Sequence, residues 1–188
     1  MRIVIGEILP LALVVTISPL NIIPAILLLF TKRPVLTASS FLAGFIAGVS
    51  LVLALFVVIA GAVNVSPGSG HSTWSGVLKL VLGVYLVVAA VRKFRGRPRA
   101  DEDGVMPKWM DGIAGYSPGK SVGAGVVLGA LNPKNVVVGL ATAVIVSAAD
   151  LSTGQQLAAC AVYVVVAVLG VAAPILVMLS LGDGAGDV

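Results

Sequence analysis

Ser18-Pro19-Leu20-Asn21-Ile22-Ile23 interrupts the first apolar segment of this chain, and Asn132-Pro133-Lys134-Asn135-Val136-Val137 interrupts the fourth. The two motifs share one pattern: a small polar residue, a proline, any residue, an asparagine and two β-branched aliphatic residues. Because proline removes a backbone donor and clashes with the preceding turn, we expect both helices to break there. Backbone groups freed at membrane depth must face protein or a wet cavity. Paired broken helices in corresponding halves point to a substrate site, so the motifs predict a small transporter with a duplicated core.

The composition places the chain among membrane proteins. Of its 188 residues, 59% are apolar and only 11% are charged, and the mean hydropathy is +1.11. Soluble domains carry about 25% charged residues. The net charge of +4 does not indicate a nucleic-acid partner, because five of the twelve basic residues fall within 92–99, directly after an apolar segment. We expect this basic cluster to bind anionic lipid head groups.

Five apolar stretches have lengths suited to crossing a bilayer. They are 3–30, 38–63, 74–91, 121–149 and 155–181. The first and fourth exceed the roughly 20 residues that a span needs, and an unwound turn at each motif, or a tilt, would use the excess. These stretches predict an all-α integral membrane protein with broken first and fourth helices.

The stretches also predict two repeats of three helices. Residues 1–91 would form the first repeat, 92–119 a basic linker, and 120–188 the second repeat. Because the second part has only two apolar stretches, we expect its third helix, the sixth of the fold, to be absent from this chain or supplied by a partner chain.

The loop charges set the expected orientation. Loops 31–37 and 92–119 hold eight of the twelve basic residues, whereas 64–73 and 148–154 hold none. Since positively charged loops stay cytoplasmic, we expect a multi-pass protein of the plasma (inner) membrane with its N-terminus outside and the 92–119 loop inside. Three spans are an odd number, so the second repeat would be inverted relative to the first.

Lys134 is the charge nearest the centre of an apolar stretch, and it is the first candidate binding residue. An ionisable group at that depth is costly and by default functional. We expect Lys134 to bind an anionic group of the substrate; the alternative is a lysine satisfied by backbone carbonyls at the break. The amides of Asn21, Asn135 and Asn132 and the hydroxyl of Ser18 would add hydrogen bonds to the substrate, or would only cap the broken helices.

Four prolines are expected to shape helices rather than to contact a ligand. Pro19 and Pro133 would let one half of the protein rock against the other. Pro24 would extend the disruption of the first helix, and Pro174 would kink the fifth.

Two small-xxx-small patterns predict close contact between helices. One runs from Gly44 to Gly48 and the other from Gly125 to Gly129. Small residues at this spacing let helix backbones approach each other in a membrane. We expect these two patterns to pack the two halves together.

The sequence offers no residue set for catalysis or for a cofactor. His71 has no second metal ligand nearby, Cys160 is the one cysteine, and there is no nucleotide-binding loop. We therefore expect no enzyme activity, no cofactor and no metal. Transport would draw on a proton gradient, the substrate gradient or a partner.

The residues Ser18-Pro19-Leu20-Asn21-Ile22-Ile23-Pro24 and Leu131-Asn132-Pro133-Lys134 resemble the paired proline breaks of the LysE superfamily of exporters. The chain is most similar to the GAP or Sap branch of actinobacteria, which is named for addressing glycopeptidolipid and sulfolipid to the cell surface. This resemblance implies six helices in two inverted three-helix repeats, with export from the cytoplasm or the inner leaflet.

The residues and the resemblance together predict an inner-membrane exporter, or flippase-like protein, that moves a lipid or lipid precursor outward. Two alternatives remain open. One is export of an amino acid or another small solute, and the other is a non-transporting assembly factor that docks a lipid-synthesis enzyme through the basic loop. Besides that enzyme, a second copy of the chain is the protein partner left open.

Overall fold

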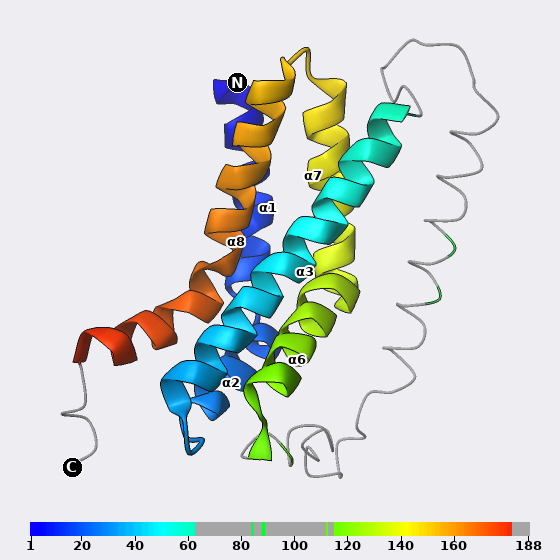
Figure 1. Cartoon of the computed structure of the whole chain (residues 1–188). Helices are drawn as coiled ribbons and strands as arrows, with labels where there is room; N and C mark the ends of the chain where they lie inside the picture. Colours follow the sequence, from blue (N-terminus) through cyan, green and yellow to red (C-terminus); the bar gives the residue numbers. More distant parts are fainter. Residues whose placement is uncertain (63–83, 85–87, 89–111, 113–114, 182–188) are drawn as a thin grey trace, which may run out of the picture.

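The computed structural model describes residues 1–62, 84, 88, 112 and 115–181, and its regular elements there are α-helices (Figure 1). They are α1 (Arg2–Thr16), α2 (Pro19–Leu28), α3 (Pro34–Ala62), α6 (Pro118–Leu131), α7 (Pro133–Ala148) and α8 (Thr153–Leu181). No strand occurs in these ranges, and the prediction of an all-α protein is confirmed. The predicted third stretch, the basic cluster at 92–99 and the tail at 182–188 lie almost wholly outside the described residues.

Both motif prolines begin a new helix. Pro19 opens α2 and Pro133 opens α7, where a missing amide hydrogen costs no intrahelical bond and the fixed φ suits the helix. A residue before proline is pushed out of the helical region, and Ser18 and Asn132 are extended, with ψ of 110° and 118°. The chain therefore turns by 52° between α1 and α2 and by 57° between α6 and α7. The predicted breaks are confirmed.

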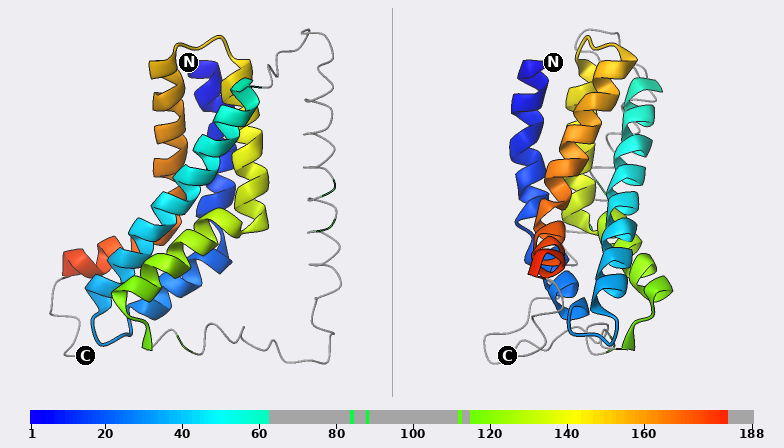
Figure 2. Two further views of the ribbon diagram at one scale, coloured as in Figure 1. Left: turned by 45° about the vertical axis from the view of Figure 1, so that its right-hand side comes forward. Right: turned by 60° about the vertical axis from the view of Figure 1, so that its left-hand side comes forward.

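The two halves of the chain run in opposite directions. In Figure 1, α1 and α2 descend and α3 returns upward, whereas α6 and α7 ascend and α8 returns downward. Each broken pair is followed by a helix of 29 residues. The halves interleave, because α1 packs along α8, and α3 packs along α6 and α7 (Figure 2). The described residues of both halves contribute to one hydrophobic core.

Glycines set the closest of these contacts, between α3 and α6. A methyl group at Gly48 would lie 2.6 Å from the carbonyl oxygen of Val126, and one at Gly129 would lie 2.7 Å from that of Phe45. The other two glycines of the small-xxx-small patterns are equally close to the facing backbone. The patterns thus pack one half on the other, as the sequence predicts.

The helix α1 packs on α8 through an apolar stripe and one polar contact. The hydroxyl of Thr16 donates to the carbonyl of Val166 as well as to that of Ala12 in its own helix. Gly170, one turn after Val166, allows this approach, because a methyl group there would meet the carbonyl of Thr16. The buried stripe of α1 has helical spacing and consists of Val4, Ile8, Ala12 and Val15.

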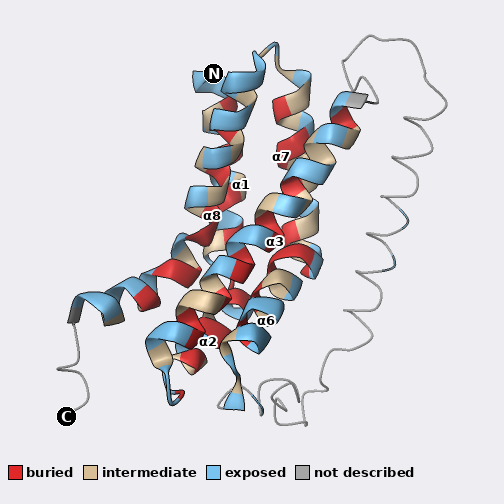
Figure 3. Cartoon of the chain, in the orientation of Figure 1, coloured by how far each residue is buried: buried red, intermediate tan, exposed pale blue. Residues whose placement is uncertain are grey.

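Many large apolar side chains lie on the outer surface. Leu51 and Val58 on α3 are 65% and 68% exposed, and Leu157 on α8 is 67% exposed. Figure 3 shows exposed residues along the outer faces of the helices and buried ones where helices meet. Two helices are long and apolar enough to cross a membrane, or up to four spans if each bent pair counts as one. The described part is therefore that of a membrane protein.

Pro24 and Pro174, the other two prolines singled out in the sequence, stand inside helices. The helix α2 continues through Pro24, which is buried, so the first break stays confined to Ile17 and Ser18 and the expected longer disruption is wrong. Neighbouring helices in a membrane protein can hold a helix through a proline. Pro174 lies inside α8, and Figure 1 shows this helix bent in its C-terminal half.

Replacement of Gly125 by Ala should destabilise the protein, because its methyl group would overlap the carbonyl of Phe41. We expect a loss of about 1–3 kcal/mol in the free energy of unfolding, measured by denaturant titration in detergent. Gly123→Ala is the matched control on the same helix, since a methyl group there meets nothing within 4 Å, and it should leave stability unchanged or higher. Equal effects of the two substitutions would contradict the packing described.

Candidate functional site

The two breaks meet in the core through a hydrogen bond between their asparagines. Asn132 Nδ2 donates to Asn21 Oδ1 at 3.1 Å, although the residues stand 111 positions apart. Asn21 is 0% exposed and Asn132 is 7% exposed. A buried bond of this kind is costly to break, because each partner would lose its match away from water. We call the region around it the crossing, defined by Ser18, Asn21, Asn132 and Asn135.

Asn135 satisfies the end of α6. Pro133 has no amide hydrogen to give to the carbonyl of Gly129, four residues earlier in the chain. The side-chain Nδ2 of Asn135 replaces it and donates to the carbonyls of Gly129 and Leu128, at 3.3 Å and 3.0 Å. The side-chain amide of Asn135, in α7, therefore bonds back across the break to the last turn of α6 and has a structural role.

Asn132 satisfies the start of α7. Its side-chain Oδ1 accepts from the backbone amide of Lys134 at 3.1 Å, which is the usual N-cap bond for asparagine. Its Nδ2 is therefore available to bond Asn21 in the other half of the protein. One side chain thus caps its own helix and ties the two breaks together.

The backbone partners determine where the oxygen and the nitrogen of each asparagine side-chain amide lie. Asn132 Oδ1 must accept from the backbone amide of Lys134, so Asn132 Nδ2 faces Asn21. Because Nδ2 is a donor, the Asn21 atom that faces it must be the acceptor Oδ1. Asn135 must turn Nδ2 to the two carbonyls. The orientation of an asparagine amide is assigned from such partners, and here every partner is a group of known polarity.

The first break lacks the features that satisfy the second. Ser18 is the N-cap of α2 and is 3% exposed, but its side chain makes no cap hydrogen bond. Asn21 corresponds to Asn135 in the motif, yet its Nδ2 is buried without a hydrogen-bond partner among the described residues, and so is Asn135 Oδ1. The crossing therefore holds one unmatched donor and one unmatched acceptor.

Lys134 is the second residue of α7 and is half-buried. With 14 residues in α6 and 16 in α7, about 1.5 Å per residue places it roughly 20 Å along the helices from either end. The helices α2, α3 and α8 carry no charged residue. The acidic residues in the described ranges are far along the chain from the breaks. Glu7 is 11 residues before Ser18, and Asp150 is 16 residues after Lys134. Among the described residues, Lys134 is therefore the charge at the level of the crossing.

Thr142 is a buried polar residue that the sequence analysis missed. It is 0% exposed and faces the buried Tyr163 of α8. It lies seven residues after Asn135, so both side chains fall on one face of α7. Two polar residues at that spacing in an apolar helix are the signal that would have identified it.

An apolar groove of about 500 Å³ separates α3 from α8 and is open to the outside. Its walls follow helical spacing on both sides, through Leu53 and Val57 on α3 and through Leu157 and Val164 on α8. Ser50 and Cys160 are the polar residues in its lining. Its chemistry suits a hydrocarbon chain rather than a polar solute.

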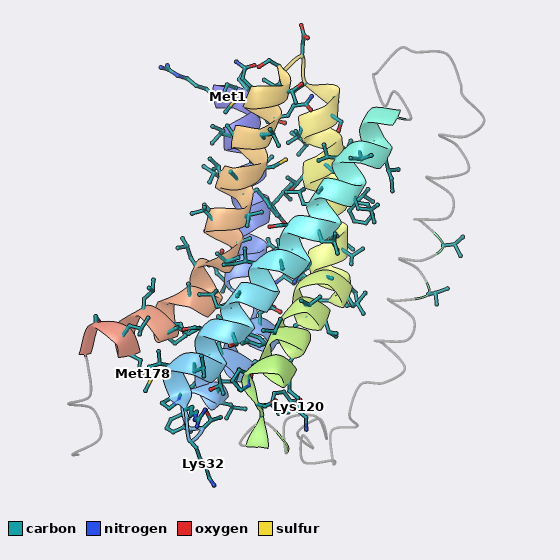
Figure 4. All side chains as sticks on the ribbon, viewed as in Figure 1. Met1, Lys32, Lys120 and Met178 are labelled. Carbon is teal, nitrogen blue, oxygen red and sulfur yellow. The ribbon has the colours of Figure 1, made fainter. Side chains whose placement is uncertain are left out.

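A second, polar pocket of about 370 Å³ lies where α2, α3 and α6 end or begin. Its lining includes Lys32, Arg33 and Tyr116. Figure 4 shows Lys32 and Lys120 at one end of the molecule and Met1 at the other. The described basic loop residues thus gather at the end opposite the N-terminus.

Comparison with known proteins identifies one family. The sequence model of the family described as Sap, sulfolipid-1-addressing protein, matches residues 8–187. Neither curated protein sequences nor solved structures gave a significant match.

Replacement of Asn135 by Leu should cost more stability than the same change at Asn21. A leucine side chain at position 135 would leave one buried and one partly buried carbonyl without this donor, and an unsatisfied buried group costs about 1–3 kcal/mol. Asn21→Leu breaks one bond but also removes an unmatched donor, so we expect a loss of about 1 kcal/mol. Denaturant titration in detergent measures both. A larger loss at Asn21 would contradict the structural role of Asn135.

Proposed function

The chain belongs to the Sap, sulfolipid-1-addressing protein, family, and from that premise we propose that it exports an anionic lipid or lipid precursor across the plasma membrane. The observation that carries the proposal is the crossing. Two broken helices meet there through the Asn21–Asn132 bond, inside a bundle whose long helices α3 and α8 carry no charge. Lys134 is the second residue of α7, the helix that begins at this point.

Polar groups at this depth are costly, which supports a binding role for them. A half-buried lysine in an apolar bundle needs an anion, a carbonyl or water. Asn132 and Asn135 already satisfy the backbone at the break, so Lys134 is not needed for that task. Lys134 would bind the anionic group of the transported lipid. The crossing would bind the polar groups next to that anionic group.

The opposite directions of the two halves support a route for alternating access. Equal long helices, similar bends of 52° and 57°, and the shared motif suggest an inverted duplication, as in other transporters built from inverted repeats. Pro19 and Pro133 would serve as the joints of the motion. Rocking would break and remake the Asn21–Asn132 bond, and so open the crossing to one leaflet at a time.

The groove between α3 and α8 favours a lipid over a small solute. A solute exporter needs a closed polar cavity, whereas this groove is apolar and open to the side. We propose that acyl chains stay in such lateral grooves while the head group passes through the crossing. The basic cluster at 92–99 lies outside the described residues and stays a predicted site for anionic lipid heads.

Lys134→Ala should trap the lipid on the inner side. In cells lacking the native protein, we expect wild type and Lys134→Arg to restore the lipid to the surface fraction, because both keep the charge. Lys134→Ala should lower surface delivery at least tenfold at equal expression. Lipid profiling of inner-membrane and surface fractions measures it.

Lys120→Ala is the matched control, because this lysine stands in the first turn of α6, away from the crossing. It should export normally. Full rescue by Lys134→Ala would remove the lysine from the mechanism. If Lys134→Ala also works while changes in the 92–99 cluster abolish delivery, the chain is an assembly factor instead.

The orientation can be measured with single cysteines. Starting from Cys160→Ala, which has no cysteine left, Ser152→Cys and Lys32→Cys place thiols at exposed positions in loops at the two ends. We propose that the N-terminus lies outside, so a membrane-impermeant maleimide should label position 152 in intact cells and position 32 only after permeabilisation. The reverse pattern would show the opposite orientation.

A further inference from the structure

Two unmatched polar atoms at the crossing are complementary in character. Asn21 Nδ2 is a donor and Asn135 Oδ1 is an acceptor, and both are buried without a hydrogen-bond partner among the described residues. Their polarity is fixed by the backbone groups that hold the other ends of the network. Buried polar atoms in native proteins nearly always have partners. A group that both donates and accepts would match both atoms.

The motif correspondence indicates where such a group would sit. Ser18 corresponds to Asn132, and Asn21 corresponds to Asn135, with the same extended backbone at the two cap positions. Asn132 reaches across to Asn21. The corresponding pair is Ser18 and Asn135, and there the bond is missing: Ser18 carries a hydroxyl where Asn132 carries a longer amide.

The shorter side chain explains the unmatched acceptor. An amide at position 18 would present an Nδ2 donor toward Asn135 Oδ1, as Asn132 does toward Asn21. The shorter serine side chain makes no cap bond, and Ser18 is only 3% exposed. The Asn21–Asn132 pair is thus joined by a direct bond, whereas no such bond satisfies Asn135 Oδ1.

We propose that Ser18, Asn21 Nδ2 and Asn135 Oδ1 form a binding site for one neutral group that both donates and accepts a hydrogen bond, either a hydroxyl of the transported molecule or a water. The group donates to Asn135 Oδ1 and accepts from Asn21 Nδ2. The site is neutral because these three side chains carry no charge. It complements Lys134, which takes the anionic part.

The use of this site in transport rests on the proposed export function, but the site itself rests on the hydrogen bonds of the crossing. Its test is therefore a measurement of stability and binding that needs no transport. If Lys134→Ala traps lipid but the results below are negative, only this site is wrong. If the results below are positive but Lys134→Ala exports normally, the site stands and the export route is wrong.

Ser18→Asn supplies the missing amide, and Ser18→Leu supplies a side chain with the same branching and the same number of heavy atoms but no polar group. Asparagine is a favourable N-cap residue, so the start of α2 tolerates it. In the full chain in nanodiscs of phosphatidylglycerol and phosphatidylethanolamine, we expect Ser18→Asn to raise the melting temperature by about 2–4 °C. Ser18→Leu should lower it, because it displaces the bound group and leaves both atoms unmatched.

A pair of probes distinguishes the two sources of the bound group. Monoolein carries hydroxyls on an oleoyl chain, and methyl oleate carries the same chain without them. A rise in the wild-type melting temperature with monoolein but not with methyl oleate, lost in Ser18→Asn, would identify a lipid hydroxyl. No shift with either probe, together with stabilisation by Ser18→Asn, would identify water.

The proposal would be overturned by a destabilising amide. If Ser18→Asn lowers the melting temperature as much as Ser18→Leu does, there is no room for a polar group between Ser18 and Asn135. Equal shifts with monoolein and methyl oleate, unchanged in Ser18→Asn, would show binding of the chain alone elsewhere and would likewise reject a hydroxyl site.

Discussion

A backbone carbonyl in the middle of a membrane has no water to bond to, and this constraint governs the core of the protein. Each proline break removes the donor that such a carbonyl would otherwise have. At the second break, the amide of Asn135 supplies a new donor and the amide of Asn132 caps the next helix. The Asn21–Asn132 bond then joins the breaks. This bond links α2 directly to the residue that caps α7.

The two halves share one arrangement of helices but differ in how the polar groups at their breaks are hydrogen-bonded. Their directions, bends and long helices correspond, and glycines bring α3 against α6 and α1 against α8. The polar groups do not correspond, because Ser18 stands where the other half has Asn132. A fully satisfied crossing would be a rigid joint. Asn21 Nδ2 and Asn135 Oδ1 lack hydrogen-bond partners among the described residues, which is compatible with the motion proposed above for the crossing.

Much of the architecture could be predicted, because it depends on local chemistry. The prolines at 19 and 133 fix where the backbone loses a donor, and both breaks are present. The glycine patterns determine where two helix backbones can come into contact, and α3 and α6 are in contact at these glycines. Pro24 was misjudged, since whether a helix survives a proline depends on the helices around it. The roles of Asn132 and Asn135 stayed ambiguous in the sequence, because a cap and a ligand contact use the same amide.

The sequence by itself determined that this is an α-helical membrane protein with two broken helices, since hydropathy and proline act within a few residues of the chain. Only the tertiary structure decided that Asn132 bonds Asn21 across 111 residues and that Asn135 is committed to α6. It also decided that Asn21 Nδ2 and Asn135 Oδ1, at the crossing, have no partner among the described residues. The physical reason is that a hydrogen bond between distant segments depends on the packing of whole helices. That packing sets side-chain distances to within an ångström, and no local pattern contains them.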